Sequence, residues 1–172
     1  MDKGLLEMNR GEYLSQLARI HGWKTGAEIG LWYGETFYHL LDSVPGIVLY
    51  GIDAWKELGE YPHHKDVHEN KKSIMLRALH YGDRANIISG ESVKAADLFG
   101  DGVLDFVFID ADHSAAAVSA DIKAWAPKVR LGGYVTGHDW DWSSVRDGVN
   151  AVLAGIVPGT AEKDFVWTWE KV

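Results

Sequence analysis

Short apolar runs alternate with amphipathic stretches along most of the chain. Apolar residues dominate five runs, as they do in strands covered on both faces of a sheet: 25–29, 48–52, 86–89, 103–109 and 134–136. Between these runs apolar residues recur every three or four positions, which predicts helices over 11–21, 36–41, 67–79, 92–98, 114–125 and 144–153. Strand and helix alternate from residue 25 to 155, and 165–169 reads as a last strand. The pattern therefore predicts an α/β fold with a mainly parallel sheet.

Turn residues and chain length complete this outline. Gly22 is expected to end the first helix, Ser114 to cap a later one, and the polar stretch 56–64 to form a loop. A chain of 172 residues suits one domain with one continuous core. We expect an N-terminal helix within 1–22 and a single α/β core over 23–172.

Composition narrows the classes of partner and of chemistry. The net charge is -8 with no basic run, which argues against nucleic acid and anionic membranes as partners. The chain has no cysteine, and this excludes disulfides, a thiolate nucleophile and a cysteine-based zinc site. Neither a signal peptide nor an apolar run of membrane-spanning length is evident, so a cytoplasmic location is the default expectation.

A glycine-rich turn after the first predicted strand marks a candidate ligand site. Gly30 and Gly34 let the backbone approach a ligand where a Cβ would block it. Glu28 precedes them at the carboxyl end of the strand, where open α/β sheets bind ligands; the alternative is an exposed acid at a strand end. Asp53 lies 19 residues beyond Gly34, at the end of the next strand, where an acid can accept both hydroxyls of a ribose.

A second group of polar residues follows the fourth and fifth predicted strands. Asp110, Asp112 and His113 follow the fourth strand, and His138 and Asp139 follow the fifth. Because neighbouring parallel strands end at one edge of a sheet, we expect the two groups to converge. Carboxylates suit Mg²⁺, whereas a histidine ligand suits Mn²⁺, Fe²⁺ or Zn²⁺ better. The alternative is that Asp112 and the following serine only cap a helix and His138 is a loop histidine with its bonds satisfied.

These motifs together resemble the class I S-adenosylmethionine-dependent methyltransferases, and in particular a small-molecule O-methyltransferase-like subgroup (methyltransferase domain 24 type). The resemblance covers about residues 11–170 and rests on five segments: 28–34, 51–53, 89–92, 106–114 and 131–139. It implies a single-domain, doubly wound Rossmann-like methyltransferase fold with an antiparallel C-terminal strand. It also implies S-adenosyl-L-methionine as cofactor and a small molecule as methyl acceptor.

The resemblance assigns roles to individual residues. The cofactor would contact Glu28, Gly30, Gly34, Asp53, Trp55, Glu91, Ser92 and Asp110. A Mg²⁺ or Mn²⁺ ion would be bound by Asp110, His138 and Asp139, and the catalytic groups would be His113, as general base, and Asp110. His138 falls where the more strongly metal-dependent members have a carboxylate. The long N-terminal extension that usually helps build the acceptor pocket is absent from this sequence.

Several alternatives stay open at this stage. Trp55 can stack on adenine or be a core aromatic, and Ser92 can contact adenine or cap a helix. Trp167 and Trp169 are expected in the core or at the edge of a homodimer. A nicotinamide-dependent oxidoreductase on a related fold is a competing function, although its G-x-G-x-x-G pattern would need glycine where Glu28 stands. A non-catalytic module that only binds the cofactor is the third hypothesis.

Overall fold

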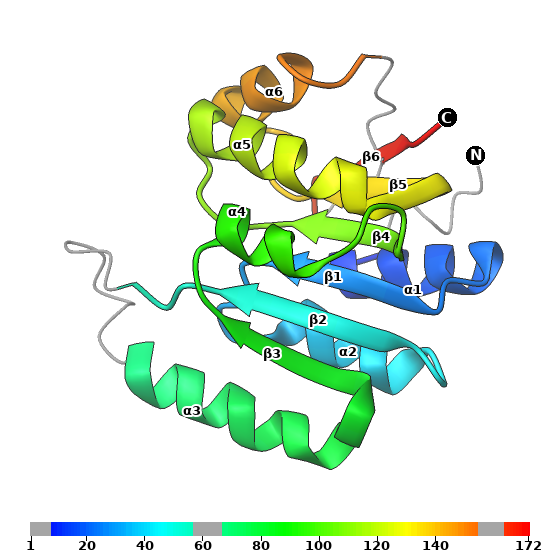
Figure 1. Cartoon of the computed structure of the whole chain (residues 1–172), viewed down its shortest axis with the longest axis vertical. Coiled ribbons are helices and arrows are strands. Elements are labelled where there is room, and N and C mark those ends of the chain that lie inside the picture. Colours follow the sequence, from blue (N-terminus) through cyan, green and yellow to red (C-terminus); the bar gives the residue numbers. More distant parts are fainter. Residues whose placement is uncertain (1–7, 57–66, 155–163) are drawn as a thin grey trace.

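A six-stranded sheet forms the centre of the molecule. The computed structural model describes residues 8–56, 67–154 and 164–172. Within them the strands lie in the order β3-β2-β1-β4-β5-β6, and all neighbours are parallel except β5 and β6. Figure 1 shows this sheet, in which the carboxyl ends of the parallel strands lie at one edge and β6 runs the other way. The strands are β1 (Thr25–Ile29), β2 (Val48–Asp53), β3 (Ala85–Ser89), β4 (Leu104–Ile109), β5 (Val129–Gly137) and β6 (Trp167–Glu170). The predicted mainly parallel sheet with an antiparallel C-terminal strand is confirmed.

Helices cover both faces of this sheet. One buried cluster joins the sheet to α1 (Arg10–His21), α2 (Glu35–Ser43) and α3 (Val67–Ala78). The cluster on the other face joins it to α4 (Ser92–Ala95), α5 (Ala115–Trp125) and α6 (Ser143–Asn150). Short 3₁₀ turns continue three of these helices: Leu79–Arg84, Ala96–Leu98 and Ala126–Lys128. The fold is therefore doubly wound, as the resemblance implied. None of the helices in the described ranges is long and apolar enough to cross a bilayer.

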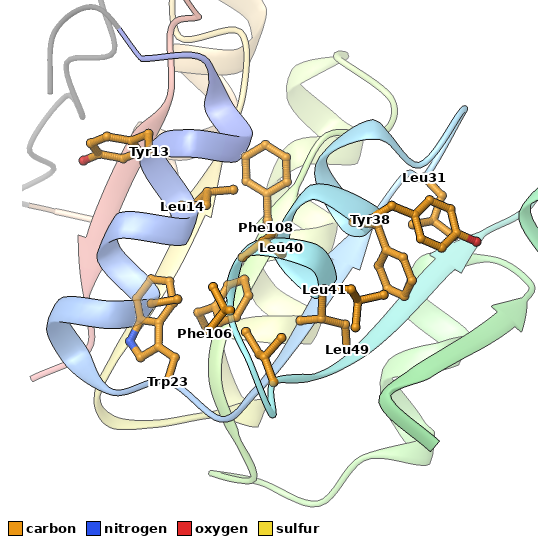
Figure 2. Packing of buried hydrophobic residues seen from close by; sticks show 14 of the residues in the cluster. Tyr13, Leu14, Trp23, Leu31, Tyr38, Leu40, Leu41, Leu49, Phe106 and Phe108 are labelled. Carbon is orange, nitrogen blue, oxygen red and sulfur yellow. The ribbon is translucent and has the colours of Figure 1, made fainter. Parts of the chain in front are cut away.

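The first helix is fixed firmly against this sheet. Asn9 and Glu12 form a reciprocal capping box at its start, and Gly22 ends it with φ 64° in the left-handed region. Leu14 is fully buried in the first cluster, where Trp23 stacks on Phe106 with ring centroids 4.4 Å apart (Figure 2). Burial of one leucine contributes about 1.5–3 kcal/mol. The capped and packed α1 is thus a rigid support for the residues at its start.

Some element boundaries differ from the sequence prediction. β5 begins at Val129, well before residue 134, because its pairing with β4 shifts between Leu104 and Phe106 and so accommodates Gly132 at φ 71°. β6 begins only at Trp167, since Phe165 has a positive φ of 41° that no strand tolerates. The predicted loop at 56–64 lies, from residue 57 on, outside the described residues.

Candidate functional site

The carboxyl ends of β1, β2, β4 and β5 form the candidate site. The chain runs outward from β1 to β2 and β3 on one side, and to β4 and β5 on the other. The gap between β1 and β4 is therefore the topological switch point at which open α/β sheets bind ligands. Backbone hydrogen bonds extend the ladder past the strand ends: Gly30 donates to the Ile52 carbonyl, and Asp110 donates to the Ile29 carbonyl. The polar residues that follow the strands are thereby brought together.

Two glycines shape the loop after β1 for reasons within the protein itself. Gly30 has φ +87°, and a Cβ on it would lie 2.2 Å from the Asp110 carbonyl oxygen. Gly34 has φ +69°, and a Cβ on it would lie 2.7 Å from Ile74 Cδ1. The sequence prediction attributed both glycines to close approach of a ligand. The structure provides a further cause, since the loop passes close to its own neighbours, and the approach of a ligand stays a prediction.

Asp53 ties this loop to the end of β2. Its Oδ2 accepts hydrogen bonds from the backbone N–H groups of Leu31 (2.9 Å) and Trp32 (3.0 Å), and its Oδ1 accepts from that of Trp55 (2.7 Å). Each carboxylate oxygen has further acceptor capacity, so contact with a ribose stays a prediction. Trp55 itself is buried, has φ 42°, and lies under the Lys71 ammonium at 5.4 Å from the ring centroid. Within the described part of the chain, its indole Nε1 has no hydrogen-bond partner.

Glu91 and Ser92 differ in how accessible they are to a ligand. Lys56 and Lys94, at 2.7 and 2.9 Å, pair with the exposed Glu91 carboxylate and lower its pKa to about 2. The Ser92 hydroxyl instead accepts a hydrogen bond from Trp125 Nε1 at 2.9 Å. The alternative that Ser92 caps the helix is wrong, because Glu91 is the cap residue and no side chain bonds there. The Glu91 carboxylate is thus the more accessible of the two side chains, and contact of either residue with adenine stays a prediction.

Glu28 is buried, so its interpretation as an exposed acid is wrong. The side chain lies on β1 between Gly51 and Phe108 of the neighbouring strands and is 5% exposed. Its Oε2 has no hydrogen-bond partner among the described residues. Burial, reinforced by the charge of Asp110, raises the pKa of Glu28 well above its usual range, although Arg10 opposes the shift. A buried carboxyl oxygen without a partner is what a donor group of a ligand would satisfy.

The acids and histidines after β4 and β5 converge as predicted. His113 Nε2 lies 2.7 Å from Asp139 Oδ2 and 3.6 Å from Asp110 Oδ1. His138 Nδ1 lies 3.1 and 3.5 Å from the same two oxygens. His113 Nε2 is buried, and despite the short distance to Asp139 it forms no hydrogen bond of good geometry with any residue that the structure describes. Both histidines therefore lie beside the same two carboxylate oxygens.

The cluster has strong internal electrostatics. The carboxylates of Asp110 and Asp139 raise the pKa of His113 to about 9. Burial lowers the pKa of His138, but Asp110, Asp139 and Asp164 outweigh it and raise the pKa to about 10. Burial raises the pKa of Asp110, yet the two imidazoles outweigh it and bring the value to about 2. In the absence of another cation, two imidazolium groups neutralise the acids.

Asp164 and Arg10 complete the cluster, and neither was predicted from the sequence. Asp164 Oδ1 lies 2.8 Å from His138 Nε2, and its Oδ2 accepts from the backbone N–H of Arg10 at 2.6 Å. The Arg10 guanidinium reaches Thr36 Oγ1 at 2.9 Å and Asp110 Oδ2 at 3.5 Å. No motif marks either residue: Asp164 is separated from His138 by 26 positions. By contrast, Asp112 and Ser114 behave as the helix-cap alternative predicted.

The ligand atoms of the acid–histidine cluster fit a divalent cation. Asp110, His113 and Asp139 each offer one ligand atom, and these atoms all lie within 4.8 Å of one another. His138 faces the same oxygens through Nδ1, while its Nε2 is held by a carboxylate, the arrangement that orients metal-binding histidines. Mixed carboxylate and imidazole ligands suit Mn²⁺, Fe²⁺ or Zn²⁺ better than Mg²⁺. This group differs from the predicted trio of Asp110, His138 and Asp139, because His113 stands where His138 was expected, and His138 lies beside the same two carboxylate oxygens.

Known structures share this fold at low sequence identity. The O-methyltransferase TomG from Streptomyces achromogenes, involved in tomaymycin synthesis and solved in complex with SAM, has a TM-score of 0.68 at 16% identity; the match covers 95% of this chain and 80% of TomG. An O-methyltransferase from Bacillus cereus in complex with SAH has a TM-score of 0.64 at 18% identity, covering 94% and 80%. For a Staphylococcus aureus protein, provisionally described as a caffeoyl-CoA O-methyltransferase, the TM-score is 0.59 at 18% identity.

The length of the matches and a family model complete the comparison. This chain is covered over 84% by the Staphylococcus match but spans only 63% of that protein. No curated protein matches the chain. A family model described as "Methyltransferase domain" matches residues 27–140, which include the glycine loop, Asp53 and the acid–histidine cluster. The chain therefore belongs to this methyltransferase domain family.

Proposed function

We propose that the protein transfers a methyl group from S-adenosylmethionine to a hydroxyl of a small molecule, assisted by a divalent cation. One observation carries the proposal: acids suited to binding S-adenosylmethionine and a cluster suited to binding a cation lie at the same carboxyl edge of the sheet. Asp110 belongs to both groups, with one oxygen toward the histidines and the other toward Arg10. Methyl transfer and activation of the acceptor would therefore take place side by side.

The donor would lie across the switch point, with its nucleoside toward β2 and β3. Asp53, Trp55 and Glu91 are the candidates for ribose and adenine, as the sequence predicted. The orphaned Oε2 of Glu28 and the carboxylate of Asp110 are suited to the ammonium group at the other end. S-adenosylmethionine supplies an electrophilic methyl group on its sulfonium sulfur. The protein's contribution is to hold donor and acceptor in line.

The acid–histidine cluster would prepare the acceptor hydroxyl. Asp110, His138 and Asp139 would hold the cation, with Asp164 fixing the orientation of His138. A bound divalent cation lowers the pKa of a hydroxyl beside it. His113 is proposed to take the acceptor proton. With its pKa at about 9 the imidazole is protonated at neutral pH, so this role depends on a cation that repels that proton.

An aromatic side chain borders this cluster. Trp142 is 50% exposed and lies against the His113 ring, with centroids 4.9 Å apart. Such a face suits a flat or ring-shaped acceptor, which agrees with the sequence expectation of a small molecule.

Other expectations from the sequence stay predictions. They are the cytoplasmic location, the absence of nucleic-acid and membrane partners, and a homodimer.

The proposal is tested by methyl transfer from labelled S-adenosylmethionine to a panel of phenols and sugars, with the full chain. We expect chelation to abolish transfer and Mn²⁺ to restore it. Asp139→Asn should lower turnover strongly, whereas Asp141→Asn, an exposed neighbour, should not. Transfer that survives chelation would exclude the cation. Calorimetry with S-adenosylhomocysteine and NAD separates the remaining alternatives. Binding of NAD alone would favour an oxidoreductase. Binding of S-adenosylhomocysteine without any methyl transfer in the activity assay would favour a non-catalytic module.

A further inference from the structure

Several contacts fix the position of Arg10 at the start of α1. It is the first residue of α1, directly after the capping residue Asn9. Its backbone N–H is held by Asp164 at 2.6 Å. The next residue, Gly11, lies so close to α2 that a Cβ on it would be 2.9 Å from the His39 ring. This close contact between α1 and α2 brings the guanidinium of Arg10 over the first turn of α2.

The guanidinium lies at the β1–β4 end of the site. Its Nε donates to Thr36 Oγ1 at 2.9 Å, and Nη1 lies 3.5 Å from Asp110 Oδ2. That second distance exceeds the roughly 2.7–2.9 Å of a strong charge-assisted hydrogen bond, so Asp110 does not satisfy the group. Nη1 also lies 3.4 Å from His138 Nε2. The side chain is 29% exposed, and no residue of the described ranges accepts from its Nη2. The guanidinium of Arg10 therefore keeps N–H groups that can donate hydrogen bonds to a ligand.

No other arginine or lysine in the described part of the chain forms an ion pair with an acid at this end. Lys56 pairs with Glu91, and Lys71 lies over Trp55, both toward β2 and β3. Four acids lie near this end: Asp139 and Asp164 contact the histidines, Asp110 contacts the histidines and Arg10, and the buried Glu28 has no partner for its Oε2 among the described residues. The β4 side of the switch point thus offers one permanent cation beside Asp110 and Glu28, the two acids proposed for the ammonium group of the methyl donor.

This charge pattern matches an α-amino acid group. Such a group carries a carboxylate, which needs a cation and hydrogen-bond donors, and an ammonium, which needs acceptors. Guanidinium is the side chain best suited to carboxylates, because its planar N–H groups fit the two oxygens. A threonine hydroxyl that accepts a bond can also donate its own proton. We propose that Arg10, supported by Thr36, binds the carboxylate of the donor's amino-acid moiety, opposite the acids that take its ammonium group.

The inference rests on the proposed function, because it assumes a donor with an amino-acid moiety. It goes further in making the N-terminal helix part of the donor site, although the family model begins only at residue 27. It also makes Arg10 a determinant of specificity: ligands that have the nucleoside but lack the amino-acid group should not depend on it.

The test compares two ligands by calorimetry with the full chain. S-adenosylhomocysteine carries the amino-acid group, and 5′-methylthioadenosine keeps the nucleoside and sulfur but lacks that group. Arg10→Gln should weaken binding of S-adenosylhomocysteine about ten- to a hundredfold, the usual worth of a hydrogen bond to a charged group, and leave 5′-methylthioadenosine within about twofold. Arg19→Gln, on the same helix with its guanidinium bonded to the Ser43 carbonyl, is the matched control and should change neither.

Each other outcome has a definite meaning. Equal loss of affinity for both ligands would show that Arg10 only supports the fold, and would overturn the proposal. An unchanged affinity of Arg10→Gln for S-adenosylhomocysteine would overturn it as well. If the unaltered protein binds neither ligand, the proposed function itself fails, which the first titration shows before any variant is made.

Discussion

The replacement of Gly30 by alanine tests how tightly the loop after β1 is packed against the loop after β4. A Cβ on Gly30 would lie 2.2 Å from the Asp110 carbonyl oxygen, 2.7 Å from its carbonyl carbon and 2.8 Å from Ala111 Cα. All three are backbone atoms, so no side chain can turn aside, and the loops must separate by about 1 Å to restore contacts near 3.3 Å. The left-handed φ of +87° adds about 1–2 kcal/mol. We expect a total loss of about 3–5 kcal/mol in the free energy of unfolding.

Gly22→Ala provides the matched control for this experiment. Gly22 also has a left-handed φ, +64°, but a Cβ there would have no heavy atom within 4 Å. Its replacement should cost only the backbone term of about 1–2 kcal/mol. Urea unfolding of both variants, at unchanged m-value, measures the difference. If Gly30→Ala is no more destabilising than Gly22→Ala, the close approach of the two loops is not a real constraint, and the explanation of Gly30 given above is wrong.

Two further predictions follow from the buried charges. Glu28→Gln should raise the free energy of unfolding at pH 8 and leave it nearly unchanged at pH 4. Because the pKa of Glu28 is raised in the folded protein, the folded protein loses stability as the pH rises above the unfolded pKa of about 4.5. Glutamine does not ionise and so removes that loss. A stability difference that does not vary with pH in denaturant titrations would contradict this. Asp164→Asn should weaken Mn²⁺ binding by about ten- to a hundredfold, because His138 would lose the carboxylate that orients it. Calorimetry with Mn²⁺ checks this, and an unchanged affinity would show that His138 is not a ligand.

The main elements could be read from local patterns in the sequence. Apolar runs and helical periodicity depend only on which residues face the core, and a parallel α/β order constrains how strands connect. The strand ends were therefore located well enough to bring Asp53, Asp110 and Asp139 to one edge of the sheet. The helix stop at Gly22 and the cap at Ser114 were also predictable, because each acts within a few residues of itself.

Side-chain partners were harder to predict. Asp53 was assigned to a ribose, yet its oxygens already accept from the loop that contains Leu31 and Trp32. Ser92 was offered as an adenine contact or a cap; it is not the cap, its hydroxyl bonds to Trp125 on α5, and the adenine contact stays a prediction. In each case the residue lies where the pattern placed it. The partner is decided by the direction of the side chain and by elements that pack against it from elsewhere in the chain.

The sequence by itself determined the α/β alternation, the glycine loop and the acids and histidines at the strand ends, because these depend on local periodicity and on chain order. Only the tertiary structure brought Arg10 from the first helix and Asp164 from the segment before the last strand to those residues. It also showed that Gly30 is required by the backbone of Asp110. Contacts between distant segments depend on how capped helices pack on the sheet, and no spacing of residues along the chain encodes that geometry.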